Sequence, residues 1–96
     1  MMVLITYDVD TTTYDGQKRL HKVAKACVNY GQRVQESVFE CVLEPYQYTE
    51  LKDKLKSIMN IEKDSIRFYN LGSNWKRRVE HLGAKKPYDP EGVIIT

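Results

Sequence analysis

The residues with the clearest capacity for chemistry are Asp8 and Asp10, which follow a short run of β-branched and aromatic residues, Val3 to Tyr7. A carboxylate at the end of a strand is well placed to hold Mg²⁺, which takes one or two carboxylates together with waters and a phosphate. Such a site could support metal-assisted phosphodiester cleavage. The alternative is that both aspartates end the strand and accept turn hydrogen bonds. One chain offers few carboxylates for a metal, so a two-fold axis near Asp8 would favour the metal site.

Other catalytic patterns are absent from the sequence. It contains no glycine-rich phosphate loop, no dinucleotide fingerprint, no HExxH and no G-x-S-x-G. Its two cysteines and two histidines have spacings that match no zinc pattern. Cys27 falls on an apolar helical stripe and is interpreted as a core residue, and His21 is interpreted as a surface residue. A zinc site is therefore not expected.

Basic residues are unevenly distributed, although the net charge is only +2. Residues 16–35 contain five basic residues and no acidic one, and residues 65–96 contain six basic and three acidic residues. A polyanion could bind these two blocks. The alternative is that the lysines only solvate the outer face of a helix.

The composition is that of a single globular domain. The chain has 96 residues, of which 42% are hydrophobic and 29% charged, and a chain of this size can form one core. No apolar run approaches the roughly 20 residues that span a bilayer, and no signal peptide is recognisable. The cysteines lack CxxC spacing, which favours a reducing, cytosolic compartment.

The elements that must position Asp8 follow from the hydrophobic periodicity. The first strand, Val3–Tyr7, precedes a helix that starts near Asp15 and has Gly31 just beyond its end. Residues 33–43 alternate and form either one bent strand or a tight hairpin. Further elements are expected along the rest of the chain: a helix from Pro45 to Asn60, a strand over Ser65–Leu71, a short strand over Val79–Leu82, and a terminal strand over Val93–Ile95.

This order predicts an α+β, ferredoxin-like βαββαβ fold with an extra C-terminal strand. The whole chain, 1–96, would be one domain with a core over about 1–82 and a loop and strand over 83–96. One sheet face would stay apolar, and a homodimer that stacks two such faces would cover it. The terminal strand must join an existing edge, and the partner subunit offers one.

Two segments of this sequence together resemble the CRISPR-associated Cas2 family. They are Tyr-Asp-Val at residues 7–9 and RVQESVFEC at residues 33–41. The run KRLHKVAKACVNYGQRVQESVFEC over residues 18–41 is especially similar to members that accompany type I-C systems. Virulence-associated toxin ribonucleases of similar fold are the nearest alternative.

The resemblance implies a ferredoxin-like homodimer with stacked sheets, whose terminal strand crosses to the other subunit. It implies a role in CRISPR adaptation, in which the protein bridges dimers of the Cas1 integrase and supports duplex DNA. It also implies a Mg²⁺-dependent endonuclease, with Mn²⁺ as an alternative metal, acting on double-stranded DNA or single-stranded RNA. The metal ligand would be Asp8, one from each subunit.

The resemblance and the charge pattern together nominate the remaining site residues. Tyr7, Ser37 and Phe39 match catalytic-site positions of the family, although Phe39 also suits a core. Asp10 is ranked as a turn residue. The expected nucleic-acid-binding residues are Lys18, Arg19, Lys22, Lys25, Arg33, Arg77 and Arg78. A DNA-binding scaffold without required chemistry is the second hypothesis, because no general base other than a carboxylate or water is evident.

Overall fold

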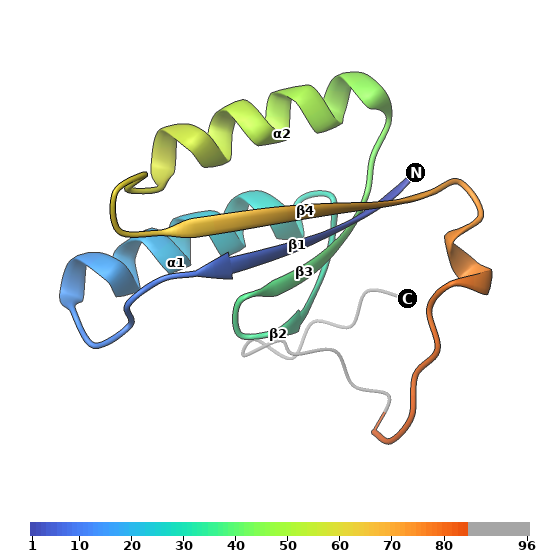
Figure 1. The fold of residues 1–96 in the computed structure, drawn as a ribbon, viewed down its shortest axis with the longest axis horizontal. Helices are drawn as coiled ribbons and strands as arrows, with labels where there is room; N and C mark the ends of the chain where they lie inside the picture. Colours follow the sequence, from blue (N-terminus) through green and yellow to red (C-terminus); the bar gives the residue numbers. More distant parts are fainter. Residues whose placement is uncertain (85–96) are drawn as a thin grey trace.

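The sheet has the antiparallel order β2-β3-β1-β4 in the computed structural model, which describes residues 1–84 (Figure 1). The elements are, in chain order, β1 (Met2–Asp8), α1 (Tyr14–Val28), β2 (Gly31–Gln35), β3 (Val38–Val42), α2 (Pro45–Ile58), β4 (Ser65–Gly72) and the short 3-10 helix η1 (Trp75–Arg77). This arrangement confirms the predicted ferredoxin-like α+β fold.

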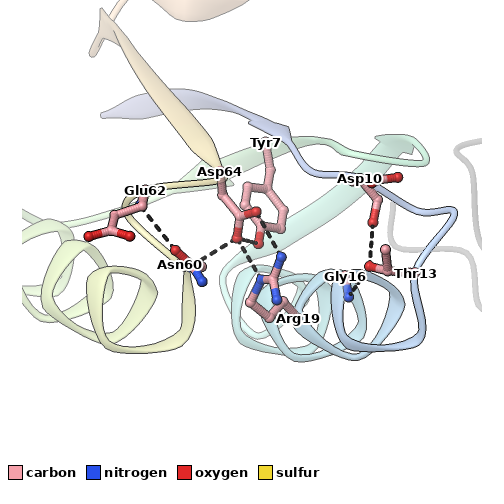
Figure 2. A network of polar contacts seen from close by, with 8 residues as sticks. All are labelled: Tyr7, Asp10, Thr13, Gly16, Arg19, Asn60, Glu62 and Asp64. Carbon is pink, nitrogen blue, oxygen red and sulfur yellow. Dashed lines mark hydrogen bonds and ion pairs between the residues drawn. The ribbon is translucent and has the colours of Figure 1, made fainter.

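Strand β1 lies inside the sheet, and its alternation decides which side chains reach the core. Val3, Ile5 and Tyr7 are buried, whereas Leu4 and Thr6 between them are half-buried. Both helices lie on the face toward which Tyr7 points (Figure 2). The other buried hydrophobic side chains come from both helices, from the sheet and from Leu43 just after β3: Met2, Leu20, Val23, Ala24, Ala26, Cys27, Phe39, Cys41, Leu43, Leu51 and Leu55.

Helix α1 begins one residue before its predicted start. Thr13 is its N-cap, and the Thr13 hydroxyl accepts a hydrogen bond from the Gly16 N–H at 3.0 Å. Asp15 lies in the first turn, where a negative charge favours the helix. The helix ends at Val28 with Asn29 as its C-cap.

Gly31 lies beyond the end of α1, as predicted, but it does not have the helix-capping role that its position suggested. Gly31 is the first residue of β2 and has no positive φ. Its glycine identity has a different cause, because a Cβ there would collide with the backbone carbonyl of Glu40 on β3. Close approach of two strands, and not backbone conformation, excludes a side chain at this position.

Residues 33–43 belong to a hairpin and not to one bent strand, the two structures that their alternating pattern allowed. Strands β2 and β3 are joined by a turn at Glu36 and Ser37, and their register shifts between Arg33 and Gln35. Phe39 and the other inward residues of β3 face the helices, while Val42 is 50% exposed on the other face.

Helix α2 begins as predicted, with Pro45 in its first turn. The Glu44 N–H donates to the Gln47 side-chain oxygen at 2.9 Å, which satisfies a free donor at the helix start. The helix ends at Ile58, two residues before the predicted Asn60. Met59 is its C-cap, and the turn that follows contains Asn60 and Asp64.

The strand predicted over Val79–Leu82 is wrong. The chain turns at Gly72, whose φ is +76°, and then forms η1, so residues 79–82 pair with no strand in the described part of the chain. Leu82 is 96% exposed. A strand needs a partner edge. The apolar residues Val79 and Leu82 suggested a strand, but they carry no information about whether such an edge is within reach. The predicted strand Val93–Ile95 lies outside the described residues.

Candidate functional site

Asp8 is the last residue of β1 and lies on the sheet face opposite the helices. Its side chain is exposed, and alternation along the strand directs it away from Tyr7. Ser65 on β4 is its cross-strand partner. On the other side, the Tyr7 N–H donates to the Ser37 carbonyl at 2.9 Å. Two predicted site residues, Asp8 and Ser37, are therefore neighbours at one end of the sheet.

The Asp8 carboxylate makes no hydrogen bond or ion pair with any residue in 1–84. Arg67 lies on the same sheet face, where it pairs with Thr6 in the β1–β4 register. Arg67 is exposed, and its guanidinium lies 5.9 Å from the ring centroid of Tyr69. An accessible carboxylate and an accessible guanidinium thus lie on the same open face, on neighbouring strands.

Tyr7 points to the helix face and joins a buried network there (Figure 2). Its hydroxyl donates to Oδ2 of Asp64 at 2.5 Å. Arg19, from α1, donates to the same carboxylate from Nε at 2.7 Å and from Nη2 at 3.0 Å. The Asn60 N–H adds a fourth hydrogen bond at 2.9 Å. The structure therefore does not bring the side chains of Tyr7 and Arg19 together with that of Asp8.

Electrostatics within this network favour an ionised Asp64 beside a neutral Tyr7. Burial alone would raise the pKa of Asp64, but hydrogen bonds from Arg19, Tyr7 and the Asn60 N–H outweigh it, so the pKa is lowered. Burial, followed by the hydrogen bond to Asp64, raises the pKa of the Tyr7 hydroxyl to about 12. The hydrogen bond to Asp64 is the largest cause of a raised pKa for Arg19. At neutral pH the network holds one carboxylate and one guanidinium.

Asp10 has the turn role that was predicted for it. Its carboxylate accepts hydrogen bonds from the Thr12 hydroxyl at 2.5 Å and from the Thr12 N–H at 2.9 Å. The hydroxyl bond and then the N–H bond lower the pKa of Asp10. Its carbonyl accepts from the Thr13 hydroxyl at 3.3 Å. Asp10 therefore shapes the entry into α1 (Figure 2).

Phe39 lies in the core and not at the open face. It is fully buried and pairs with Ile5, whose side chain faces the helices. The Arg33 guanidinium lies 5.8 Å from its ring centroid, and Arg33 Nε donates to the Glu36 carbonyl at 2.7 Å. Arg33 thus packs over the edge of the core beside the hairpin turn.

The predicted lysines share one exposed face of α1. Lys18, Lys22 and Lys25 are all exposed, and their spacing of four and three residues places them on one side of the helix. Tyr14, one turn earlier, lies with its ring centroid 5.4 Å from Lys18 Nζ. Arg77 and Arg78 are also exposed, in and just after η1. We call Tyr14, Lys18, Lys22 and Lys25 the lysine face.

Two residues of interest were missed from the sequence. Asp64 resembled any other acidic residue, and nothing near it in the chain indicated that its partners lie on β1 and α1. Arg67 could have been found, because Ile66 and Phe68 on either side are apolar and direct it to the opposite face, the one shared with Asp8.

A metal ion would find one protein ligand in a single copy of the described chain. Residues 1–84 contain no group of three or more His, Cys, Asp or Glu side chains that could hold an ion. Mg²⁺ needs only one or two carboxylates, because waters and substrate phosphates complete its shell. Asp8 fits this requirement as one such carboxylate.

Fold and site together define a small ferredoxin-like protein whose sheet presents a carboxylate at the end of an inner strand. A family model described as CRISPR associated protein Cas2 matches residues 1–79. The chain therefore belongs to the Cas2 family. This assignment confirms the resemblance to the Cas2 family that the sequence showed.

Relatives match over almost the whole chain. A protein named CRISPR-associated endoribonuclease Cas2, from Nitratidesulfovibrio vulgaris, is 59% identical over 99% of this chain and 93% of its own length. One named CRISPR-associated endonuclease Cas2, from Halalkalibacterium halodurans, is 59% identical over 99% of each. A crystal structure of Streptococcus pyogenes Cas2 at pH 6.5 is 60% identical, with a TM-score of 0.80, and the match covers 86% of this chain and 100% of that one.

Neither helix of residues 1–84 has the length and apolar character needed to cross a membrane.

Proposed function

We propose that this protein is a metal-dependent endonuclease that hydrolyses phosphodiester bonds at a site shared by two copies of the chain. The observation that carries the proposal is Asp8: an exposed carboxylate at the end of β1 with no partner among residues 1–84. The relatives named endoribonuclease and endonuclease support it. An uncompensated carboxylate that shares a sheet face with an arginine suits a site that receives both a cation and a phosphate.

The second copy follows from the open sheet face. Val42 is 50% exposed and Tyr69 is 42% exposed on that face, and two copies stacked there would bury both. Stacking would also bring the Asp8 carboxylates of the two copies toward a common axis. The arrangement would supply the two carboxylates that Mg²⁺ accepts.

Each residue near Asp8 has a defined task in this scheme. Bound Mg²⁺, or Mn²⁺, would supply an activated water and neutralise charge on the phosphate. Asp8 would hold the cation, and Arg67 would bind a phosphate oxygen of the substrate through its guanidinium. Ser65 pairs with Asp8 on β4, and Ser37 lies in the hairpin turn, where its carbonyl accepts from the Tyr7 N–H. In this scheme the two serine hydroxyls would orient water or phosphate.

A second role is favoured by a separate observation, the lysine face. Three exposed lysines on one side of α1 form a surface that suits the backbone of duplex DNA. In this role the protein bridges Cas1 integrase dimers in the cytosol and supports the DNA captured during spacer acquisition. Both cysteines are free and buried, which suits a reducing compartment. The two roles are compatible within one protein.

The test is cleavage of labelled duplex DNA and single-stranded RNA with and without Mg²⁺, comparing wild type with Asp8→Asn. The matched control is Asp53→Asn, which removes an exposed carboxylate from the outer side of α2. We expect Asp8→Asn to lose Mg²⁺-dependent cleavage by about 100-fold or more, on the scale of removing one electrostatic catalytic group, and Asp53→Asn to cut normally.

Other outcomes separate the alternatives. If the protein cleaves the single-stranded RNA but not the duplex DNA, it is a ribonuclease. If wild type cuts neither substrate, or Asp8→Asn cuts as well as wild type, the nuclease proposal is wrong and the scaffold role remains. Sedimentation of each variant checks that the comparison is made between proteins of the same oligomeric state.

A further inference from the structure

Asp64 is the one buried charged residue in the described part of the chain. Its side chain has 0% exposed surface, whereas that of its partner Arg19 has 17%. A buried carboxylate is costly unless hydrogen bonds compensate it. Asp64 accepts four of them, from Tyr7, twice from Arg19, and from the Asn60 N–H. Because Asp64 accepts four hydrogen bonds, we expect the Tyr7 hydroxyl, the Arg19 guanidinium and the Asn60 backbone to be held in fixed positions.

These partners come from three segments that are distant in sequence. Tyr7 lies at the end of β1, Arg19 lies in α1, and Asn60 lies in the turn between α2 and β4 (Figure 2). The Tyr7–Asp64 bond spans 57 positions in the sequence, and the Arg19–Asp64 pair spans 45. The Asp64 carboxylate therefore connects the end of β1 to α1 and to the turn that follows α2.

The two residues that flank this network in the chain are Asp8 and its cross-strand partner. Tyr7 immediately precedes Asp8 on β1, and Asp64 immediately precedes Ser65 on β4, which pairs with Asp8. The Tyr7–Asp64 hydrogen bond therefore ties together, on the helix face, the two backbones that carry Asp8 and Ser65 on the open face. Strand ends otherwise open most readily, and β1 ends at Asp8.

We propose that Asp64 is a positioning residue, which acts through Tyr7 and Arg19 to fix the backbone that presents the Asp8 carboxylate. This inference rests on the proposed nuclease function. Mg²⁺ demands nearly ideal octahedral geometry, and a displacement of about 1 Å in a catalytic group can cost about 100-fold in rate. Tyr7 then serves as an anchor for Asp8, and its hydroxyl proton is held by Asp64.

The test uses two variants that weaken the network without altering the open face. Tyr7→Phe removes only the hydroxyl, and Asp64→Asn removes the charge while keeping the shape. The matched control is Leu43→Val, which alters a buried side chain beside Met1, at the opposite end of β1. Asp8→Asn is measured in parallel.

Three quantities are measured for each folded variant: amide hydrogen exchange at residue 7, cleavage as a function of Mg²⁺ concentration, and binding of Mn²⁺ by its electron paramagnetic resonance signal. The residue 7 amide is informative because it is bonded to the Ser37 carbonyl. We expect Tyr7→Phe to speed exchange there about tenfold, to raise the Mg²⁺ concentration for half-maximal cleavage, and to weaken Mn²⁺ binding. Leu43→Val, which only destabilises the core, should leave the Mg²⁺ concentration for half-maximal cleavage unchanged.

The outcomes distinguish this inference from the function on which it rests. If Asp8→Asn loses cleavage while folded Tyr7→Phe and Asp64→Asn keep the wild-type Mg²⁺ requirement and exchange rate, the positioning role is wrong and the nuclease stands. If Asp8→Asn cuts as well as wild type, the nuclease proposal and this inference are both wrong. If Asp64→Asn does not fold, Tyr7→Phe decides between these outcomes.

Discussion

The hydroxyl of Tyr7 and the carboxylate of Asp64 are joined by a 2.5 Å hydrogen bond on the helix side of the sheet. The next residue along β1, Asp8, faces the opposite side. The paired Tyr and Asp at the end of the first strand therefore have separate tasks. Tyr7 holds the sheet to the helices, and Asp8 is exposed to solvent.

Replacing Asp64 should destabilise the protein strongly. Asp64→Ala leaves the Arg19 guanidinium and the buried Tyr7 hydroxyl without their partner, and a hydrogen-bonding group left unsatisfied in this way costs about 1–3 kcal/mol. The free energy of unfolding, measured in urea, checks this. Asp53→Ala on the exposed side of α2 is the control and should change it by less than about 0.5 kcal/mol. Equal effects of the two substitutions would contradict a buried network.

The stabilisation by Asp64 should be lost in acid. Its pKa is lower in the folded chain than in the unfolded chain, where an aspartate titrates at about 3.9. A lowered folded pKa contributes stability that is present above the unfolded pKa and disappears as the pH falls through the folded one. The difference in unfolding free energy between wild type and Asp64→Asn should therefore be constant near neutral pH and shrink below about pH 4.

Urea unfolding of both proteins at a series of pH values measures this difference. Comparing the two proteins cancels the contributions of the other carboxylates, which titrate over the same range. A difference that grows as the pH falls would show that Asp64 is protonated more easily in the folded chain, contrary to the hydrogen bonds that it receives.

Much of the fold could be predicted because the strands and helices carry clear hydrophobic periods. The start of α2 at Pro45 was predicted correctly, and that of α1 to within a residue. The segment 33–43 was harder, because apolar residues on both of its faces suit either one strand or a hairpin. The turn at Glu36 and Ser37 and the bulge beside Arg33 depend on pairing with β1 and within the hairpin, which a local pattern does not contain.

The site was predictable only in part, for a related reason. Asp8 stands out because a carboxylate follows an apolar strand. Arg19 lies among lysines in the sequence and was grouped with them as a phosphate ligand. Its guanidinium instead reaches Asp64, 45 positions away. Whether a charged pair is buried depends on contacts between segments that are distant in sequence. The local spacing of residues therefore does not predict the Arg19–Asp64 pair.

The entry into α1 should not tolerate a side chain at residue 16. A Cβ at Gly16 would collide with the Asp10 carbonyl and would approach the Thr13 hydroxyl at 2.8 Å. Gly16→Ala should therefore destabilise the protein by about 1–3 kcal/mol, although alanine usually favours a helix over glycine by about 1 kcal/mol. His21→Ala, at an exposed position of the same helix, is the control. A more stable Gly16→Ala protein in thermal unfolding would contradict the close approach.

The lysine face should bind nucleic acid through phosphates alone. Lys22→Glu combined with Lys25→Glu should weaken binding of duplex DNA by at least about tenfold at low salt, equally for unrelated sequences. The slope of the logarithm of affinity against the logarithm of salt concentration should become shallower by about 0.9 for each phosphate that the protein no longer neutralises. The matched control, Lys54→Glu with Lys56→Glu, makes the same charge change on exposed positions of α2. If both double variants weaken binding equally, net charge alone governs the interaction. If neither does, the lysines of α1 only solvate the helix.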